Sequence, residues 1–186
     1  MARLRYLACL GVVLGLAALF SEVRAQKVEA PEASVKAAFL FKFASFVEWP
    51  PSAFAAPDAP LVFGVVAGAD DVAAELTRIA AGRSIGGHPV VARRVRENEA
   101  IRGVHVLFVG HGVTDRQAIV ARASAQPGVL VVTETERGLE AGSSINFVVS
   151  EDRVGFEVSL DAADKSGLRI SSRMLAVARR VLPKAQ

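Results

Sequence analysis

The chain has 186 residues, of which 52% are hydrophobic and 22% charged, which is typical of one folded domain with a substantial core. Its formal net charge is +3, and it falls to +1 without the first 25 residues, which hold three arginines and one glutamate. So small a charge excludes an electrostatic affinity for nucleic acid. The single cysteine is Cys9, so a chain without those residues has no disulfide, thiolate metal site or cysteine nucleophile.

The first 25 residues predict a secretory signal peptide. Basic residues precede an apolar run over 6–20, and small residues suit cleavage after Ala25. The apolar run is short for a membrane span, which needs roughly 20 residues, although an uncleaved anchor is the alternative. After cleavage we expect a linker over 26–33 and a single domain over 34–183, without membrane insertion.

An unusually apolar helix is predicted next, in the segment VKAAFLFKFASFVEWP that runs from Val35 to Pro50, with Ser34 as its cap. At about 100° per residue its polar side chains form one narrow stripe, and Phe41 projects within that stripe. So much apolar surface needs cover on most sides. The helix is either central to its own fold or a dimer interface, and the aromatic residues for either role are Phe39, Phe43, Phe46 and Trp49.

Strands and helices then alternate along the chain. Short apolar runs predict strands buried on both faces, at 61–66, 89–95, 104–109 and 129–133. Between them we expect a helix to Ala81 capped by Asp70 or Asp71, a turn-rich loop over 82–89 and a helix from Thr114 to Ala125. This pattern predicts a three-layer α/β fold with a mostly parallel sheet in Rossmann-like or flavodoxin-like order.

The C-terminal part changes to a period of two. Segments 145–149 and 153–160 alternate in polarity and predict an antiparallel hairpin. Its apolar face belongs to the core, whereas Gly155, Glu157 and Ser159 share a small polar face that suits an edge or a docking surface. We expect Asp161 to cap a short helical turn and Ser171 to cap a last amphipathic helix that includes Val181.

The sequence shows no catalytic constellation. The three histidines lack the spacing of a metal site, a phosphate-binding glycine pattern is missing, and no serine lies in a nucleophile elbow. We therefore predict no catalytic residue, no metal and no cofactor. Parallel sheets place ligands beyond the carboxyl ends of their strands, so a small-ligand cleft is expected at Gly68, His111 and Glu134.

Several motifs in combination resemble the YfiR family of periplasmic regulators. They are the helix that ends in EWP, the strand VHVLFV, the segment INFV and the block RVGFEVSLDAADKSGLRISSRMLAVARRV, and together they span about 34–182. The resemblance implies a non-enzymatic, periplasmic homodimer. Such a protein binds the periplasmic sensor domain of an inner-membrane diguanylate cyclase, represses it and lowers cyclic-di-GMP output and biofilm formation. The alternatives are a regulator of a histidine kinase and a periplasmic small-ligand sensor.

Two details follow from this resemblance. Family members often carry a cysteine before the HVLF strand, and this chain has Val104 there, so redox control is not implied. The residues we expect to bind the partner come from the apolar helix and the C-terminal block, and they are Phe41, Phe147, Glu157, Ser159 and Ile170.

Overall fold

The structure, a computed structural model, describes residues 31–151 and 153–184. The predicted signal peptide and most of the predicted linker lie outside these ranges. From Pro31 onward the chain forms one compact unit.

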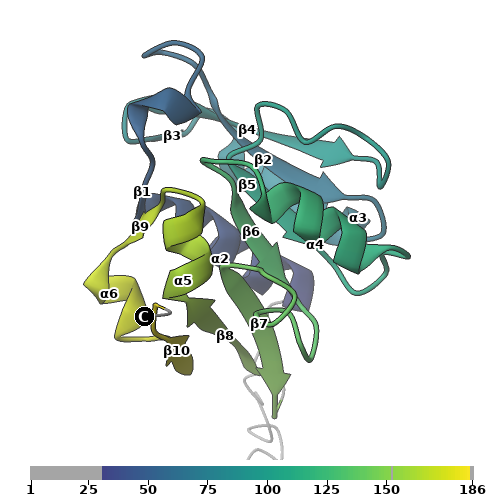
Figure 1. The fold of residues 1–186 in the computed structure, drawn as a ribbon. Coiled ribbons are helices and arrows are strands. Elements are labelled where there is room, and N and C mark those ends of the chain that lie inside the picture. The colour runs from purple at the N-terminus through teal and green to yellow at the C-terminus, as the bar shows by residue number, and fades with distance from the viewer. Residues whose placement is uncertain (1–30, 152, 185–186) are drawn as a thin grey trace, which may run out of the picture. The chain divides into compact units, whose positions relative to one another are not determined.

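Within the described residues, eight strands form one mixed sheet in the order β10-β8-β7-β6-β5-β2-β4-β3 (Figure 1). The central strands run parallel, and they are β2 (Leu61–Val66), β4 (His88–Val95), β5 (Val106–Val109), β6 (Leu130–Thr133) and β7 (Ile145–Ser150). Numbered along the chain, these strands lie in the order 2-1-3-4-5, so the winding direction reverses between β2 and β5.

The outer strands make the sheet mixed. On one side, β8 (Arg153–Ser159) returns antiparallel along β7, which is the predicted hairpin, and β10 (Arg180–Leu182) pairs parallel with β8. On the other side, β3 (Ser84–Ile85) pairs antiparallel with β4. The sequence interpretation missed β3, because it assigned 82–89 to a loop from its glycines.

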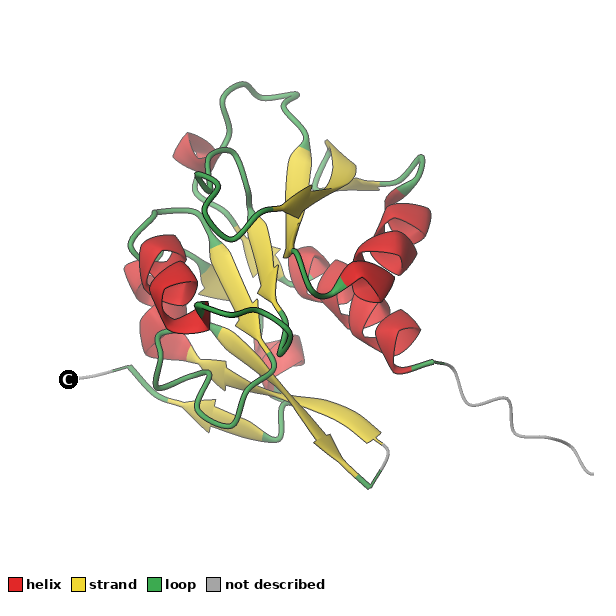
Figure 2. Ribbon diagram, turned by 90° about the vertical axis from the view of Figure 1, so that its right-hand side faces the viewer, coloured by secondary structure: helices red, strands yellow, loops and turns green. Residues whose placement is uncertain are grey.

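Buried side chains form a cluster on each face of the sheet, because successive strand residues point to opposite faces. On one face, Phe63 and Phe108 pack under α2 (Glu32–Ser45) and α3 (Asp70–Ala80). On the other, Leu107 and Val131 pack under α4 (Arg116–Ser124). Figure 2 shows α2 and α3 side by side on one side of the strands, with α4 on the opposite side. The fold is therefore mixed α/β with helices on both faces, as expected.

The first helix is shifted relative to the sequence interpretation. It begins at Glu32 without a side-chain cap and ends at Ser45, so neither Ser34 as the cap nor an end at Pro50 is correct. The residues that follow form β1 (Val47–Glu48), which pairs antiparallel with β9 (Arg169–Ile170). Proline disfavours helical geometry in the residue before it, so the backbone ahead of Pro50 gains more from strand pairing than from another helical turn.

Three other predicted helix starts also differ by a few residues. Helix α3 has no side-chain cap, and both aspartates lie in its first turn, where carboxylates favour the helix dipole. Asp115, rather than Thr114, caps α4 and accepts from the Ala118 amide. Ser159, rather than Asp161, caps α5 (Leu160–Lys165).

The final helix is shorter than expected. Ser171 caps α6 (Ser172–Leu175) as predicted, but the helix ends at Leu175 and Val181 lies in β10. Without β10, strand β8 would be the edge of the sheet, with unpaired backbone N–H and C=O groups. Residues 180–182 satisfy these groups by forming a strand beside β8, which they could not do as part of a surface helix.

Candidate functional site

One part of the sheet carries no helix in front of it. Figure 1 shows α4 in front of β5 and β6, whereas the lower parts of β7 and β8 stay open on that side. Opposite neighbours in the hairpin are Val148 with Gly155 and Asn146 with Glu157, and each pair shares a face. We call the face formed by Val148, Gly155, Glu157 and Arg180 the hairpin face.

Two arginines shape the hairpin face. Glu157 accepts from Arg180 Nε at 2.9 Å and from Arg180 Nη2 at 3.0 Å, a two-point ion pair that also raises the pKa of Arg180 through the carboxylate hydrogen bonds. Arg179 lies directly over Gly155, so that any Cβ at position 155 would overlap its side chain. Gly155 therefore lets the Arg179 side chain lie against the strand.

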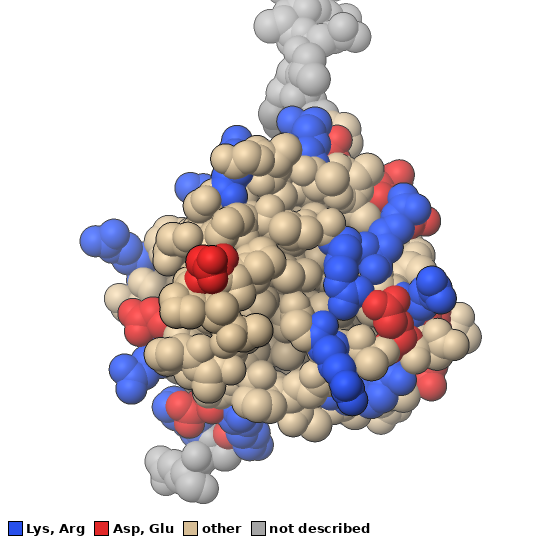
Figure 3. All heavy atoms as spheres, turned by 90° about the horizontal axis from the view of Figure 1, so that it is seen from above, with Lys and Arg blue, Asp and Glu red and all other residues tan. Residues whose placement is uncertain are grey.

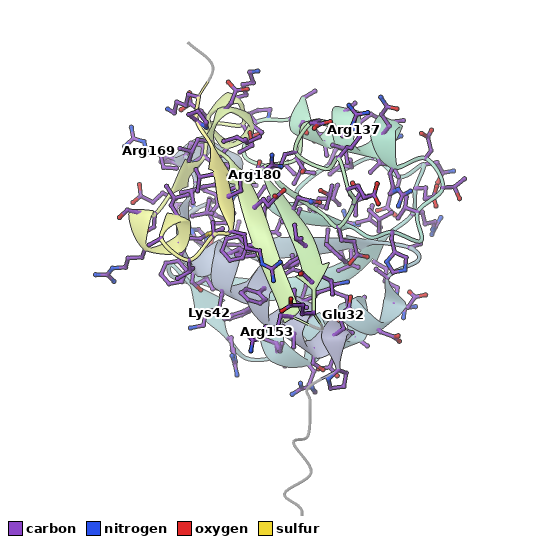
Figure 4. The ribbon with its side chains drawn as sticks, turned by 90° about the horizontal axis from the view of Figure 1, so that it is seen from below. Glu32, Lys42, Arg137, Arg153, Arg169 and Arg180 are labelled. Carbon is purple, nitrogen blue, oxygen red and sulfur yellow. The ribbon has the colours of Figure 1, made fainter. Side chains whose placement is uncertain are left out.

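A groove of about 480 Å³ runs beside this face. Val148, Glu157 and Arg180 line one part of it, and Lys36, His111 and Glu134 line another. Figure 4, which views the molecule from below, shows Arg153 at the end of the hairpin and Arg180 farther along the strands. The groove thus joins the start of α2 to the hairpin face.

A buried ion-pair network closes the α2 end of the groove. Lys36 is 5% exposed, and its Nζ pairs with Glu32 Oε1 at 2.5 Å and with Glu134 Oε2. Burial alone would lower the pKa of Lys36, but the hydrogen bonds and negative charges of the two glutamates outweigh it and raise that pKa. The network fixes α2 to the carboxyl end of β6.

His111 completes the network from the loop after β5. Its backbone N–H donates to Glu134 Oε1 at 2.8 Å, and its ring Nδ1 lies 2.8 Å from the same oxygen. Since a carboxylate only accepts, Nδ1 carries the proton in this contact. Two of the predicted cleft residues, His111 and Glu134, are therefore in direct contact.

The third predicted cleft residue, Gly68, lies apart from both. Its φ of +105° suits glycine, and it faces Gly112 so closely that a Cβ at Gly112 would stand 2.9 Å from the Gly68 carbonyl oxygen. The loops after β2 and β5 thus touch where the winding direction reverses. Gly68 lines neither of the grooves described here.

A larger groove, of about 910 Å³, lies between the start of α4 and the loop over 134–141. Buried polar contacts hold this loop in place, because Thr133 Oγ1 bonds Ser143 Oγ at 2.9 Å and Asn146 Oδ1 at 2.8 Å. Gly138 packs so closely onto these groups that a Cβ would overlap them. The groove is lined mainly by polar side chains: Thr114, Arg116, Gln117, Thr135, Arg137 and Glu140.

Two of the predicted partner-binding residues are buried. Phe147 is 3% exposed and packs its ring against those of Phe39, Phe43 and Phe108 in the core. Ser159 is 6% exposed, and its hydroxyl accepts from the Ala162 amide as the cap of α5. Neither side chain presents a surface to a partner, because strand alternation and the cap turn both inward.

The other predicted residues are half-buried and spread over the molecule. Phe41 stacks on Phe63 with ring centres 6.3 Å apart, and the Arg83 guanidinium lies 5.4 Å from its ring. Ile170 lies in β9, opposite Val47. Phe41 and Glu157 point toward opposite faces of the sheet, so the structure does not bring all the predicted residues together.

Of the aromatic residues predicted for the first helix, one is fully buried and the others are half-buried. Phe43 is 2% exposed and belongs to the core. Phe39 and Phe46 are half-buried against it, and Trp49, beyond the helix, donates from Nε1 to the Gly128 carbonyl oxygen at 3.0 Å. The protein's own core thus covers most of the apolar surface of this helix.

The sequence matches the YfiR/HmsC-like family over residues 33–179. The chain belongs to the YfiR/HmsC-like family. The predicted resemblance is therefore confirmed, and it spans both grooves and most of the hairpin face. No curated protein sequence matches the chain significantly. Membership in the YfiR/HmsC-like family indicates a regulatory, periplasmic protein that acts in cyclic-di-GMP signalling through a signalling protein's sensor domain.

The described residues contain neither a membrane-spanning helix nor a cluster of metal ligands. None of their helices is long and apolar enough to cross a membrane. None of their His, Cys, Asp and Glu side chains gather in threes as a metal ion would need.

Sequence reasoning missed Lys36 and Arg180. Lys36 was one polar residue on an apolar helix, and its partner Glu134 is 98 positions away. A lone lysine on a mostly apolar helix was the available signal, since a buried lysine needs a carboxylate. Arg180 was assigned to the end of a helix, so its pairing with Glu157 was not expected.

Proposed function

We propose that this protein binds the periplasmic sensor domain of an inner-membrane diguanylate cyclase and lowers its cyclic-di-GMP output, and with it biofilm formation. The observation that carries the proposal is an open sheet face, the hairpin face, in a chain of the YfiR/HmsC-like family. Repression requires tighter binding to the inactive cyclase than to the active one, and a tenfold shift needs a preference of about 1.4 kcal/mol.

The proposed docking surface is the hairpin face together with Val149, which lies near the hairpin turn on the opposite face of β7. Val149 is 48% exposed, one of the few large apolar side chains of the described residues that point into solvent. On the hairpin face itself, Gly155 has no side chain and Glu157 is paired with Arg180, so a partner that reached around the hairpin turn would meet an apolar residue on one face and a fixed ion pair on the other. Such a combination supplies contact area and orientation without leaving an unpaired charge at the interface.

Phe41 and Ile170 stay part of the proposal as a second contact area around α2 and β9. Both are half-buried and pack against the core, so a partner would cover the exposed part of each side chain. Phe147 and Ser159 support the docking surface from below, by holding β7 and the start of α5 in place.

The test is deletion of the gene followed by complementation, with cellular cyclic-di-GMP as the measurement. Deletion should raise cyclic-di-GMP, and the wild-type chain should restore it. Val149→Glu should fail to restore it, whereas Val91→Glu should succeed, because Val91 is equally exposed (44%) but lies on β4. Unchanged cyclic-di-GMP after deletion would contradict a role in cyclase control.

A cross-link placed at the exposed hairpin identifies the partner. Recovery of a membrane enzyme with a periplasmic domain and a cyclase domain supports the proposal. Recovery of a histidine kinase instead keeps the docking surface and refutes the cyclase as its target.

The groove of about 910 Å³ favours a second candidate, a small-ligand sensor. Grooves of this size at the carboxyl ends of parallel strands commonly hold ligands. A thermal-shift screen of periplasmic metabolites tests it, because a ligand that binds only the folded state raises Tm. A flat screen leaves protein–protein control as the function.

Dimerisation is a further part of the proposal. The half-buried Phe39 and Phe46 of the first helix offer apolar surface to a second copy. Light scattering after size-exclusion chromatography measures the mass, and Phe46→Glu should convert a dimer to a monomer. A monomeric wild-type chain at high concentration would contradict this part.

A further inference from the structure

Two histidines hold a surface segment over 50–60 that carries almost no charge. Its sequence is PPSAFAAPDAP, and Asp58 is its single charged residue. The segment lies at the top of Figure 1, and Figure 3 shows from that side a mostly uncharged face with an acidic residue on it and basic side chains around it. Most of its side chains are exposed, but Phe54 is half-buried.

Phe54 lies between two imidazole rings. Its ring centre is 3.7 Å from that of His88 with an angle of 4° between the planes, and 4.5 Å from that of His105 with an angle of 21°. His88 comes from β4 and His105 from the residue before β5. The stack therefore attaches the middle of the segment to the sheet.

The hydrogen bonds of His105 fix its protonation state. The Val62 amide donates to His105 Nδ1 at 3.1 Å, so Nδ1 must be unprotonated. His105 Nε2 lies 3.1 Å from the Ala53 carbonyl oxygen, so Nε2 carries the proton and donates. Both ring nitrogens are thus used, and the ring is neutral in the closed arrangement.

His88 is in the opposite situation. Its Nδ1 lies 2.7 Å from the Ala59 carbonyl oxygen and therefore carries a proton already. Protonation of its Nε2 would break no bond that the structure shows. His105 is consequently the ring whose protonation opposes the closed segment, because a proton on Nδ1 would face the Val62 N–H.

We propose that His105 is a pH-sensitive latch, whose protonation releases the segment over 50–60 from the sheet. The proton breaks the Val62 contact and puts a buried positive charge beside His88. The released segment would expose Phe54 and change the uncharged face that it forms. A periplasmic protein meets the external pH, for which histidine is the natural sensor.

Among the surroundings of His105, the Ala53 carbonyl oxygen favours the charged ring, but no acidic side chain of the described residues contacts it. The ring is 4% exposed, and burial lowers its pKa below the ordinary value of about 6.5, although the hydrogen bond to the Ala53 carbonyl oxygen offsets part of this and the charge of His88 adds a smaller lowering. The adjacent strand residues Val62 and Leu130 are apolar. Asp58, the acidic residue of the segment, is exposed and makes no hydrogen bond or ion pair among the described residues.

The sign of the effect follows from this lowered pKa. When the segment is open, His105 binds a proton with its ordinary pKa. When the segment is closed, His105 binds a proton less readily. The closed arrangement is thus complete above about pH 6.5 and is lost as the pH falls below it, by up to tenfold in the open-to-closed ratio for each pH unit.

Trp49, the only tryptophan of the sequence, reports on the latch because it directly precedes the segment. Its indole N–H donates to the Gly128 carbonyl oxygen. Gly128 in turn packs against the segment, because a Cβ built at Gly128 would lie 2.8 Å from the Cβ of Ala53. Emission measured between pH 8 and pH 4.5 should show a transition below pH 6.5 while far-UV circular dichroism stays constant. Hydrogen exchange of segment 50–62 should rise in the same range relative to that of α4.

Three single-histidine variants locate the transition. His105→Gln cannot gain a proton, and its amide can still donate toward Ala53, so this variant should show no transition. His88→Asn removes the other ring of the stack, so it should weaken the closed arrangement but keep a pH-dependent transition, whereas His111→Gln, outside the segment's contacts, is the matched control and should keep the transition unchanged. The same transition in His105→Gln, or none in the wild type, would overturn the latch.

A measurement on the wild type covers the case in which His105→Gln fails to fold. Nitrogen NMR should find Nδ1 of His105 unprotonated at pH 7.5, and its protonation should coincide with faster exchange of the Val62 amide. A protonated Nδ1 at pH 7.5, or protonation without faster exchange, would equally overturn the proposal.

Discussion

Replacing Lys36 by methionine should destabilise the fold by far more than the loss of an ordinary salt bridge. The lysine side chain is 6% exposed and that of Glu134 is 8% exposed, so the change leaves a buried carboxylate without its cation. Breaking a fully buried pair costs about 3–5 kcal/mol. His111 keeps two contacts to Glu134, and the adjoining groove admits water, so we expect about 2–3 kcal/mol here.

Urea unfolding at pH 7, followed by circular dichroism, measures this loss directly. For a domain of this size it corresponds to a fall in Tm of roughly 4–12 °C. The pKa of Lys36 is raised, so its contribution is complete below about pH 10.5 and is lost only as the pH rises through the folded value. At pH 7 the whole contribution is therefore present.

Two further variants test whether the loss of stability comes from the unpaired, buried carboxylate of Glu134. Lys36→Met combined with Glu134→Gln removes both charges and should recover at least half of the lost stability. Lys165→Met is the matched control, because Lys165 pairs with Asp161 at 2.7 Å but is 71% exposed, and it should cost less than about 0.5 kcal/mol. Equal effects of Lys36→Met and Lys165→Met would show that the buried network contributes nothing special.

Three other substitutions test the packing, each by urea unfolding. Gly138→Ala should cost about 2–4 kcal/mol, since its Cβ would displace the buried hydroxyl and amide beneath it, and a cost under 0.5 kcal/mol would contradict this contact. Ser159→Ala should cost about 1 kcal/mol through the lost cap of α5, and unchanged stability would show that the cap is not needed. Phe156→Ala, in the core, should cost about 3–5 kcal/mol, whereas Val177→Ala, at a residue 70% exposed, should stay within about 0.5 kcal/mol.

The parallel sheet and the hairpin could be predicted because each leaves a local pattern. Strands buried on both faces are continuous apolar runs such as LVFGVV, and the hairpin alternates around residues 150–153. Strands β1, β9 and β10 have two or three residues each, too few to show any period. They exist because distant backbone partners are available, which local sequence does not reveal.

The candidate site was predictable only in part, for the same reason. Alternation placed Glu157 on the correct face of β8, and the strand-end rule brought His111 and Glu134 together. The burial of Phe147 could not be predicted, because it depends on α2 covering that face of β7. Lys36 and Arg180 depend on partners 98 and 23 positions away, and no spacing in the sequence announces such pairs.

Because β10 is the last strand of the chain, cleavage of the backbone just before it would disrupt the hairpin face. Arg180 reaches Glu157 only through the short stretch after α6, where Val177 is 70% exposed. A protease that cut this stretch would detach the arginine half of the ion pair and uncover an edge of β8, while both buried clusters stayed intact. A single cut there would thus remove the Arg180–Glu157 ion pair and leave the rest of the domain folded.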